Sequence, residues 1–291
     1  MVVPVRRFAF LVHPLVPVAR RLQGLRCGSA PIALGLRAGT EPDDCGVLAR
    51  LSYRGVEGVI VGVPMLPEEL LADQERALRC MLRAVQIAGP VAHVGLGSVL
   101  SVVAGRGAAL QAACGIPVTT GNAATAWAAW RIAARVAAGR RVGVIGAKGT
   151  VGRALVELLG GVADPQDLGA FEVLVGAHTT GGTVEPGRLR PGTHLVDVAL
   201  PPTLSGPPPR GVSVLPGERL ALPAGWSRDV WGWLFHVVAG YGPRHVYACL
   251  LEPLLAVLEA RTEPWQHGRA LSAATVRAFG EAAARHGFAV D

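Results

Sequence analysis

The sequence predicts an α/β fold with two α/β domains, and three observations support this class. Hydrophobic residues make up 51% of the 291 residues and charged residues only 17%, which excludes a disordered chain. The first half alternates short apolar runs with helical patterns, as expected for parallel strands buried on both faces. A glycine-rich turn near the middle of the chain follows an apolar run and precedes a helical pattern.

The pattern of apolar and polar residues orders the elements along the chain. We expect strands at 8–13, 31–35, 58–63, 91–97 and 116–120, and helices at 67–88 and 122–138. Further strands are expected at 171–178 and 194–200, with helix from Arg244 onward. The domains predicted from these elements are an N-terminal α/β substrate domain at 1–118, a connecting helix at 119–138, a Rossmann-like domain at 139–235 and a helical segment at 236–291 that packs back between them.

The run RRVGVIGAKGTVGRALVELLGG (140–161) predicts a buried strand, a tight turn and a helix. Gly146, Gly149 and Gly152 have GxxGxxG spacing, and glycines there let backbone N–H groups approach a phosphate at a helix N-terminus. Lys148 either adds charge to that phosphate or is simply solvated, and the sequence leaves both open. With Thr150, these residues form the predicted cofactor-binding turn.

The strand that follows this turn is unusual for a nucleotide-binding domain. The residue that binds the adenosine ribose usually ends a second strand, roughly 20 positions beyond the glycines. The next apolar run, 171–178, begins 19 residues after Gly152 (171 − 152), and its Glu172 stands at the start of the run. Either this run doubles as the second strand, or the second strand and its helix are missing. We favour the second alternative, which makes the predicted Rossmann-like parallel sheet a truncated one.

The five cysteines (Cys27, Cys45, Cys80, Cys114 and Cys249) are scattered and follow no metal-ligand or disulfide spacing, so we expect no metal site. The net charge of +7 suits an acidic partner, and no basic run with interleaved aromatics indicates nucleic-acid binding. The longest uncharged stretch, 84–105, is interrupted by Gly89-Pro90, so we expect no membrane span. No signal segment is recognisable, and we expect a cytoplasmic protein.

The segment HVYACLLEP (245–253) contains the candidate nucleophile. The residues before and after Cys249 are predicted to be helical, so His245, Cys249 and Glu252 fall on or near one helical face. A thiolate there takes part in thioester exchange, and His245 acts as its base or stabilises it as an imidazolium. The alternative is that Cys249, like the other cysteines, is one more small buried hydrophobe.

Several motifs resemble one known family, the long-chain acyl-[acyl-carrier-protein] reductases of cyanobacterial alkane synthesis. The similarity runs through most of the chain. The residues that carry it are MLPEEL (65–70), GLGSVLS (95–101), TTGNAATAW (119–127), the glycine turn, and the C-terminal run YACLLEPLLAVLEA, HGRALS and GEAAARHGF. The last block is the most specific, because it keeps the cysteine, the glutamate and the closing HGF in order.

The resemblance implies that Cys249 accepts an acyl group from an acyl carrier protein or coenzyme A thioester, with Glu252 as the matching acid. It also implies NADPH as the cofactor that reduces the acyl-enzyme. The candidate substrate and oxyanion residues are Gly121, Asn122, Thr125 and Ser101. The family's nucleotide domain has a second-strand block, which we interpret as missing from this sequence. We therefore predict an acyltransferase-like enzyme in which the acyl group on Cys249 passes to a non-hydride acceptor. The alternatives are an NADPH-dependent acyl reductase and a non-catalytic scaffold subunit that partners another enzyme of the pathway.

Overall fold

The computed structural model of the protein describes residues 6–14, 45–179, 181–230, 232–233, 244–266 and 268–290. Cys27 and the strand predicted at 31–35 lie outside these residues. The chain forms two compact units, the first from residues 1–121, 221–268 and 286–288, the second from 122–220, 269–285 and 289–291. Each unit is a sheet covered by helices, so the prediction of two α/β domains is confirmed. The division differs from the predicted boundaries, because the helix after Gly121 belongs to the second unit and the C-terminal segment contributes to both.

The sheet of the first unit has six strands. In spatial order they are β12 (Ser227–Arg228), β2 (Gly46–Tyr53), β3 (Val56–Gly62), β1 (Arg7–Val12), β4 (His93–Leu96) and β5 (Val118–Thr119). Strands β3, β1, β4 and β5 are parallel, whereas β2 runs antiparallel to β3. We did not predict β2, because Arg50 and Ser52 interrupt the continuous apolar run that marks the buried parallel strands.

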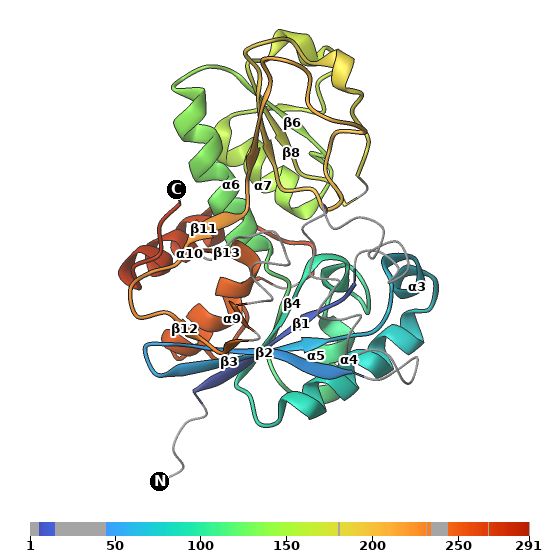
Figure 1. The fold of residues 1–291 in the computed structure, drawn as a ribbon, viewed down its shortest axis with the longest axis vertical. Coiled ribbons are helices and arrows are strands. Elements are labelled where there is room, and N and C mark those ends of the chain that lie inside the picture. The colour runs from blue at the N-terminus through green and yellow to red at the C-terminus, as the bar shows by residue number, and fades with distance from the viewer. Residues whose placement is uncertain are drawn as a thin grey trace. The chain divides into compact units, whose positions relative to one another are not determined.

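Helices cover both faces of this sheet (Figure 1). The helices α3 (Pro67–Ala72), α4 (Gln74–Ala88) and α5 (Ala108–Cys114) pack with one face, where Ala9 and Leu11 of β1 join the same core cluster. Helix α9 (Ala248–Leu258) covers the other face, and Phe10 points that way. The helix predicted at 67–88 is divided because Asp73 caps α4 by accepting a hydrogen bond from the Arg76 amide at 2.9 Å.

Close contacts fix the direction of α9 on the sheet. A Cβ atom at Gly95 in β4 would stand 2.6 Å from the Cγ of Pro253, so the strand and the helix touch there. At the other end, the His93 ring at the start of β4 is hydrogen-bonded to the Arg261 carbonyl just beyond α9. The helix therefore runs antiparallel to β4, and its N-terminus lies at the carboxyl edge of the strands.

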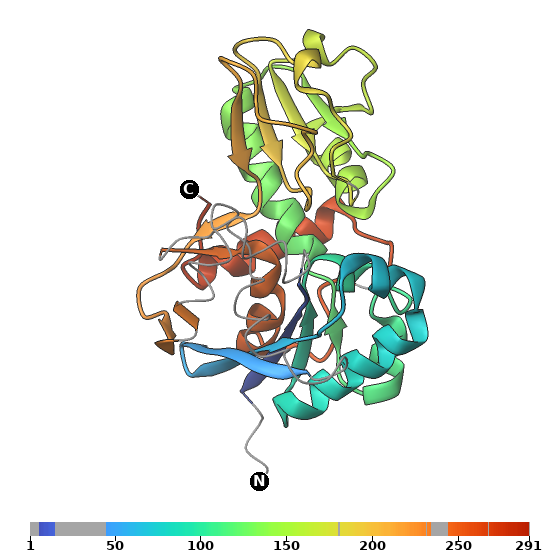
Figure 2. The same cartoon turned by 45° about the vertical axis from the view of Figure 1, so that its right-hand side comes forward.

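The second unit has a five-stranded, fully parallel sheet (Figure 2). Its order is β10 (Ser213–Pro216), β9 (His194–Asp197), β8 (Val173–Gly176), β6 (Val142–Ile145) and β7 (Val162–Ala163). The helices are α6 (Asn122–Ala137), α7 (Thr150–Leu159) and α10 (Ala273–Arg285). Helices α6 and α7 lie side by side on one face of the sheet, and α10 packs against these two helices. Loops with the 3₁₀ turns η2 (Leu168–Ala170) and η3 (Pro186–Arg188) cover the opposite face, around Leu174 and Leu195.

The prediction that the second strand is missing is wrong. Strand β7 follows α7 directly and pairs in parallel with β6, as a second strand of a nucleotide-binding unit does. Only Val162 and Ala163 form it, which is too short to leave an apolar pattern in the sequence. Within the described sheet β7 is the edge strand. The sheet therefore has a second strand but no third strand beyond it. The prediction of a truncated parallel sheet is confirmed in this form.

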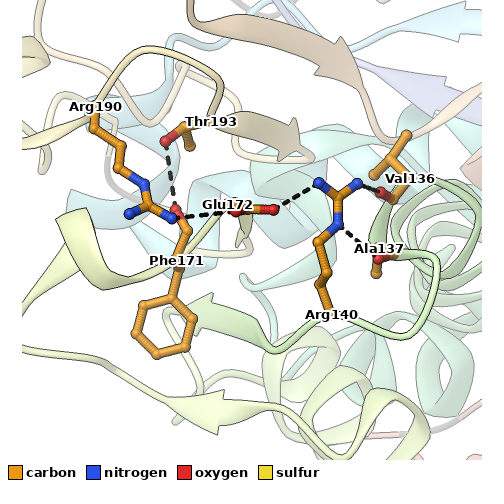
Figure 3. Close-up of polar contacts among 7 residues, drawn as sticks. All are labelled: Val136, Ala137, Arg140, Phe171, Glu172, Arg190 and Thr193. Atoms are coloured by element: carbon orange, nitrogen blue, oxygen red, sulfur yellow. Dashed lines mark hydrogen bonds and ion pairs between the residues drawn. The ribbon is translucent and has the colours of Figure 1, made fainter.

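Glu172 stands at the amino end of β8, the edge of the sheet opposite the glycine turn. Its carboxylate forms ion pairs with Arg140 at 2.6 Å and Arg190 at 3.5 Å (Figure 3). The Arg140 guanidinium also donates to the carbonyls of Val136 and Ala137 at the end of α6. This network ties a helix end to the sheet, which is a structural task and not ribose recognition.

No helix among the described residues is long and apolar enough to cross a bilayer. The remaining short elements are the 3₁₀ turn η1 (Ser98–Ser101) and the strands β11 (Arg219–Ala221) and β13 (His245–Tyr247).

Candidate functional site

The carboxyl edge of the first unit's sheet brings several polar residues together. Because β1, β4 and β5 are parallel, the residues that follow them lie at one edge: His13 after β1, η1 after β4, and Thr120-Gly121 after β5. The neighbours of β1 on its two sides, β3 and β4, make this a topological switch point, where α/β proteins bind ligands. The N-terminus of α9 lies at the same edge, and it carries Cys249.

Cys249 is the second residue of α9, which begins at Ala248 after the extended Tyr247. The thiol is half-buried, and none of the four described cysteines forms a disulfide. The first N–H groups of a helix lack intrahelical partners and form the positive end of its dipole, so negative charge is stabilised in this turn. The structure therefore distinguishes Cys249 from Cys114, which ends α5 at the opposite pole of a helix.

His245 does not share a helical face with Cys249. The structure places His245 in β13, and the helix starts only at Ala248, so the predicted one-turn spacing is wrong. The β-branched and aromatic side chains of Val246 and Tyr247 favour an extended backbone, which sequence reasoning overlooked. A role for His245 as base or partner of the thiolate therefore lacks the helical geometry on which it was predicted.

Gly121 lies against the backbone of Cys249. A Cβ atom at Gly121 would stand 2.9 Å from the Cys249 Cα and nearer still to its Cβ, closer than real Cβ contacts. Gly121 also has a φ of +77°, a conformation that glycine adopts without strain. Two separate requirements, space and backbone angle, thus demand glycine beside the thiol.

The carboxylate of Glu252 holds the segment 119–121 in place through hydrogen bonds. Glu252 is fully buried in α9, and its Oε2 accepts hydrogen bonds from the Thr119 hydroxyl and, at 3.1 Å, from the Gly121 amide. This use of the Gly121 amide differs from the predicted oxyanion role, because the N–H is directed at Glu252. Glu252 itself is placed to hold the end of β5 against α9, and so to position Cys249.

A second buried bond anchors the neighbouring residue. The Thr120 hydroxyl is hydrogen-bonded to the side-chain oxygen of Gln266, and the Gln266 amide donates to the Gly268 carbonyl at 2.5 Å. Thr120 and Gln266 are each only 3% exposed. Sequence reasoning missed Gln266, because it stands in the polar segment RTEPWQHGR (261–269), where a buried glutamine leaves no signal.

His13 was also missed, because we treated it as the end of a strand. Its Nε2 accepts from the Val99 amide at 3.2 Å, and its Nδ1 lies 2.9 Å from the Pro14 carbonyl, so Nδ1 carries the proton. Burial lowers the pKa of His13 from 6.5 to about 4, against a smaller opposite effect of the Pro14 bond. The neutral ring thus fixes η1, whose predicted site residue Ser101 donates to the Ser98 carbonyl at 2.6 Å.

The other predicted residues belong to the second unit. Asn122 and Thr125 lie in the first turns of α6. The glycine turn joins β6 to α7: Gly146 has a φ of +83°, Gly149 caps α7, and a Cβ atom at Gly152 would stand 2.9 Å from the Ala147 Cα. The turn thus has the close backbone packing expected of a phosphate-binding turn. Lys148 is exposed within it, and Thr150 begins the helix.

A carboxylate that the sequence did not reveal lies beside this turn. Asp164 follows β7 directly, and its Oδ1 accepts from the amides of Gly146 at 2.7 Å and Ala147 at 3.2 Å. Because β7 was too short to recognise, the residue at its end was missed as well.

Two further carboxylates lie at the ends of β9 and β10. Asp197 accepts hydrogen bonds from Ala199 and Thr203, so both of its carboxylate oxygens have protein partners. Desolvation and, second, the charge of Asp197 raise the pKa of Glu218 from 4.5 to about 8. Among the described residues, no group of three histidine, cysteine or acidic side chains is arranged to hold a metal ion.

The fold and these sites define a class: an α/β protein with a thiol at a helix N-terminus in one unit and a glycine-turn parallel sheet in the other. No model of a known protein family matches the sequence. The chain is similar to the aminotransferase PigE of Serratia sp. (strain ATCC 39006), with 26% identity over 278 residues. The match covers 80% of this chain but only 32% of the relative, so the chain spans about a third of that protein's length.

This similarity contradicts the predicted function. The relative is named as an aminotransferase, whereas we predicted transfer or reduction of an acyl group. The acyl-enzyme intermediate and the oxidoreductase fold that we predicted with that activity conflict with this name as well. The motifs that suggested those activities describe a thiol and a glycine turn, and such features do not fix which group is transferred. The relative is an enzyme, which agrees with the coarser prediction that this chain belongs to one.

Proposed function

We propose that the protein takes part in amino-group transfer by holding the carbonyl substrate of that reaction on the thiol of Cys249. An aminotransferase exchanges an amino group with an aldehyde or ketone, so a site that binds a carbonyl carbon suits a relative of such an enzyme. The observation that supports this most is the position of Cys249 in the first turn of α9, against the backbone of Gly121.

The proposed step is a reversible addition. The sulfur of Cys249 forms a bond to the carbonyl carbon while the carbonyl π bond breaks, and the oxygen takes up the proton that left the sulfur. The product is a hemithioacetal, and reversal restores both partners with no oxidant or reductant. The N-terminal amides of α9 favour negative charge first on sulfur and then on the developing alkoxide.

Glu252 acts in this proposal as a positioning residue. Its buried carboxylate bonds to Thr119 and to the Gly121 amide, which holds the end of β5 against the first turn of α9. A site with both a fixed backbone and a half-buried thiol limits the orientations from which a carbonyl group approaches the sulfur.

The amino transfer itself does not fit the residues of this chain. Enzymatic transamination uses pyridoxal phosphate held as a Schiff base on a lysine, which becomes reactive when desolvated. The sequence has one lysine, Lys148, and its side chain is exposed in the glycine turn. The transfer would therefore take place on a partner enzyme or on a segment that corresponds to the two thirds of the relative outside the match.

Other predictions continue as proposals. The glycine turn supports nucleotide binding in the second unit, and the quoted motifs support descent shared with the acyl-carrier-protein reductases, without their activity. The net charge of +7 favours an acidic partner such as a carrier protein or a coenzyme A ester. A reactive thiol at Cys249 favours a reducing compartment such as the cytoplasm.

Protection from alkylation tests the proposal. The protein is treated with iodoacetamide with and without hexanal, and alkylation of each cysteine-containing peptide is followed by mass spectrometry. We expect hexanal to slow alkylation of Cys249 but not of Cys114, a matched control that is also half-buried but lies at a helix C-terminus. Equal rates at Cys249 with and without millimolar hexanal would overturn the proposal.

A further inference from the structure

Asp164 occupies the position from which a nucleotide-binding unit reads the ribose. It directly follows β7, the second strand, and lies 18 residues after Gly146 (164 − 146). Because β7 is parallel to β6, the residue after β7 stands at the same edge as the glycine turn. In dinucleotide-binding folds, an acid about 20 residues beyond the glycines binds the ribose 2′-hydroxyl.

The carboxylate of Asp164 is held by backbone. Its Oδ1 accepts from the amides of both Gly146 and Ala147, and its own amide donates to the Val144 carbonyl at 2.8 Å. Asp164 has a φ of +43°, a left-handed conformation that aspartate tolerates better than most residues. Within the described part of the chain, Oδ2 makes no hydrogen bond, so that oxygen remains to accept one from a ligand.

The topology places this carboxylate beside a second switch point. Strand β6 lies between β7 and β8, so the chain reverses its direction of strand addition there, and the carboxyl ends of β6 and β8 border the crevice where such sheets bind ligands. The close packing of this edge is visible at Gly146, where a Cβ atom would stand 2.8 Å from both the Ala177 carbonyl oxygen and the His178 Cβ. A nucleotide that enters the crevice meets the glycine turn and the carboxylate of Asp164 together.

We infer that the second unit binds an adenine dinucleotide whose ribose has a free 2′-hydroxyl, with Asp164 as the residue that determines this specificity. The inference rests on the nucleotide binding included in the proposed function and deepens it. Oδ2 accepts hydrogen bonds from the ribose hydroxyls, whereas a 2′-phosphate brings negative charge against a carboxylate that cannot move away. The preference is therefore for NADH, although the family resemblance alone implies NADPH.

Isothermal titration calorimetry of the full chain with NADH and with NADPH tests this inference. We expect NADH to bind at least about tenfold more tightly than NADPH, as one well-formed charged hydrogen bond supplies. In Asp164→Asn, NADH affinity should fall about tenfold while NADPH affinity stays level or rises. Asp167→Asn is the matched control, since it removes an equal charge from an exposed residue nearby and should keep the wild-type preference.

Two outcomes distinguish the role of Asp164 from the nucleotide binding on which it rests. If the wild-type chain binds NADPH as tightly as NADH, the role of Asp164 is overturned while nucleotide binding stands. If neither dinucleotide binds at millimolar concentration, the nucleotide site itself is lost, and the thiol chemistry of the first unit is tested separately. Because the wild-type preference already decides, a poorly folded Asp164→Asn variant does not remove the test.

Discussion

Gly121 and Cys249 are in contact through their backbones: a Cβ atom placed on Gly121 would stand 2.9 Å from the Cys249 Cα. The contact joins the end of β5 to the first turn of α9, and Glu252, further along the same helix, accepts a hydrogen bond from the Gly121 amide. The position of the thiol therefore depends on a residue far away in the sequence.

Gly121→Ala should destabilise the first unit by about 2–4 kcal/mol, because a Cβ adds both a steric clash and left-handed strain. Urea denaturation measures the loss, and alkylation of Cys249 reports whether the thiol has moved. Gly115→Ala is the matched control, since Gly115 has a φ of +69° with open space around its Cβ position. Gly115→Ala should lower the free energy of unfolding only by the left-handed strain, about 1–2 kcal/mol. Equal losses in the two variants would show that the contact with Cys249 contributes nothing.

Glu252→Gln should weaken the anchor of the 119–121 segment. Glutamine keeps one oxygen at the position of Oε2, where both hydrogen bonds end, but an amide oxygen is a weaker acceptor than a carboxylate oxygen, so the two bonds weaken at a cost of about 1–3 kcal/mol. Thr119→Val removes one donor and leaves the Gly121 bond, so its effect should be smaller. The alkylation rate of Cys249, measured beside urea denaturation, should change more in Glu252→Gln. An unaltered rate in both variants would contradict the positioning role of Glu252.

His13 should make the first unit sensitive to acid. Its pKa is lowered from 6.5 to about 4 in the fold, so the unfolded chain binds more protons between these values and stability falls as pH drops through this window. The expected loss between pH 7 and pH 5 is about 2 kcal/mol. His13→Asn should lack this part of the slope in urea denaturation at the two pH values. A variant with the wild-type slope would show that His13 is not the group responsible.

Glu218 should have the opposite effect on the second unit. Its pKa is raised from 4.5 to about 8, so the folded state binds the extra proton and stability falls as pH rises across that window. Glu218→Gln keeps a neutral side chain at every pH, so its melting temperature relative to wild type should rise from pH 5 to pH 8. The exposed Glu185, changed to Gln, should show no such trend. A constant difference for Glu218→Gln would exclude the raised pKa.

The sequence revealed the buried core of the fold because continuous apolar runs leave a clear pattern. Strands β1, β3, β4 and β8, helix α6 and the glycine turn all lie where the pattern predicts them. Strand β2 was missed because Arg50 and Ser52 interrupt its apolar run, and β7 because two residues form no pattern. These short or mixed strands depend on tertiary pairing, which a local pattern does not contain.

The candidate site was only partly predictable for a related reason. Cys249, Glu252 and Gly121 are brought together as part of one site, whereas His245 proved to lie on a strand. His13 and Asp164 escaped notice because the backbone amides that they accept hydrogen bonds from are distant in sequence, and Gln266 because its partner, the Thr120 hydroxyl, is distant as well. The group transferred was also mispredicted, since a thiol motif specifies reactivity toward carbonyl carbon and not the reaction that follows.

The most direct test of the central claim is carbon-13 NMR of the full chain mixed with hexanal labelled at its carbonyl carbon. The proposal predicts a resonance of a tetrahedral carbon bonded to sulfur and oxygen, present in wild type and in Cys114→Ala and absent in Cys249→Ala. The absence of this signal from the wild-type protein at millimolar hexanal, or its persistence in Cys249→Ala, would contradict the account.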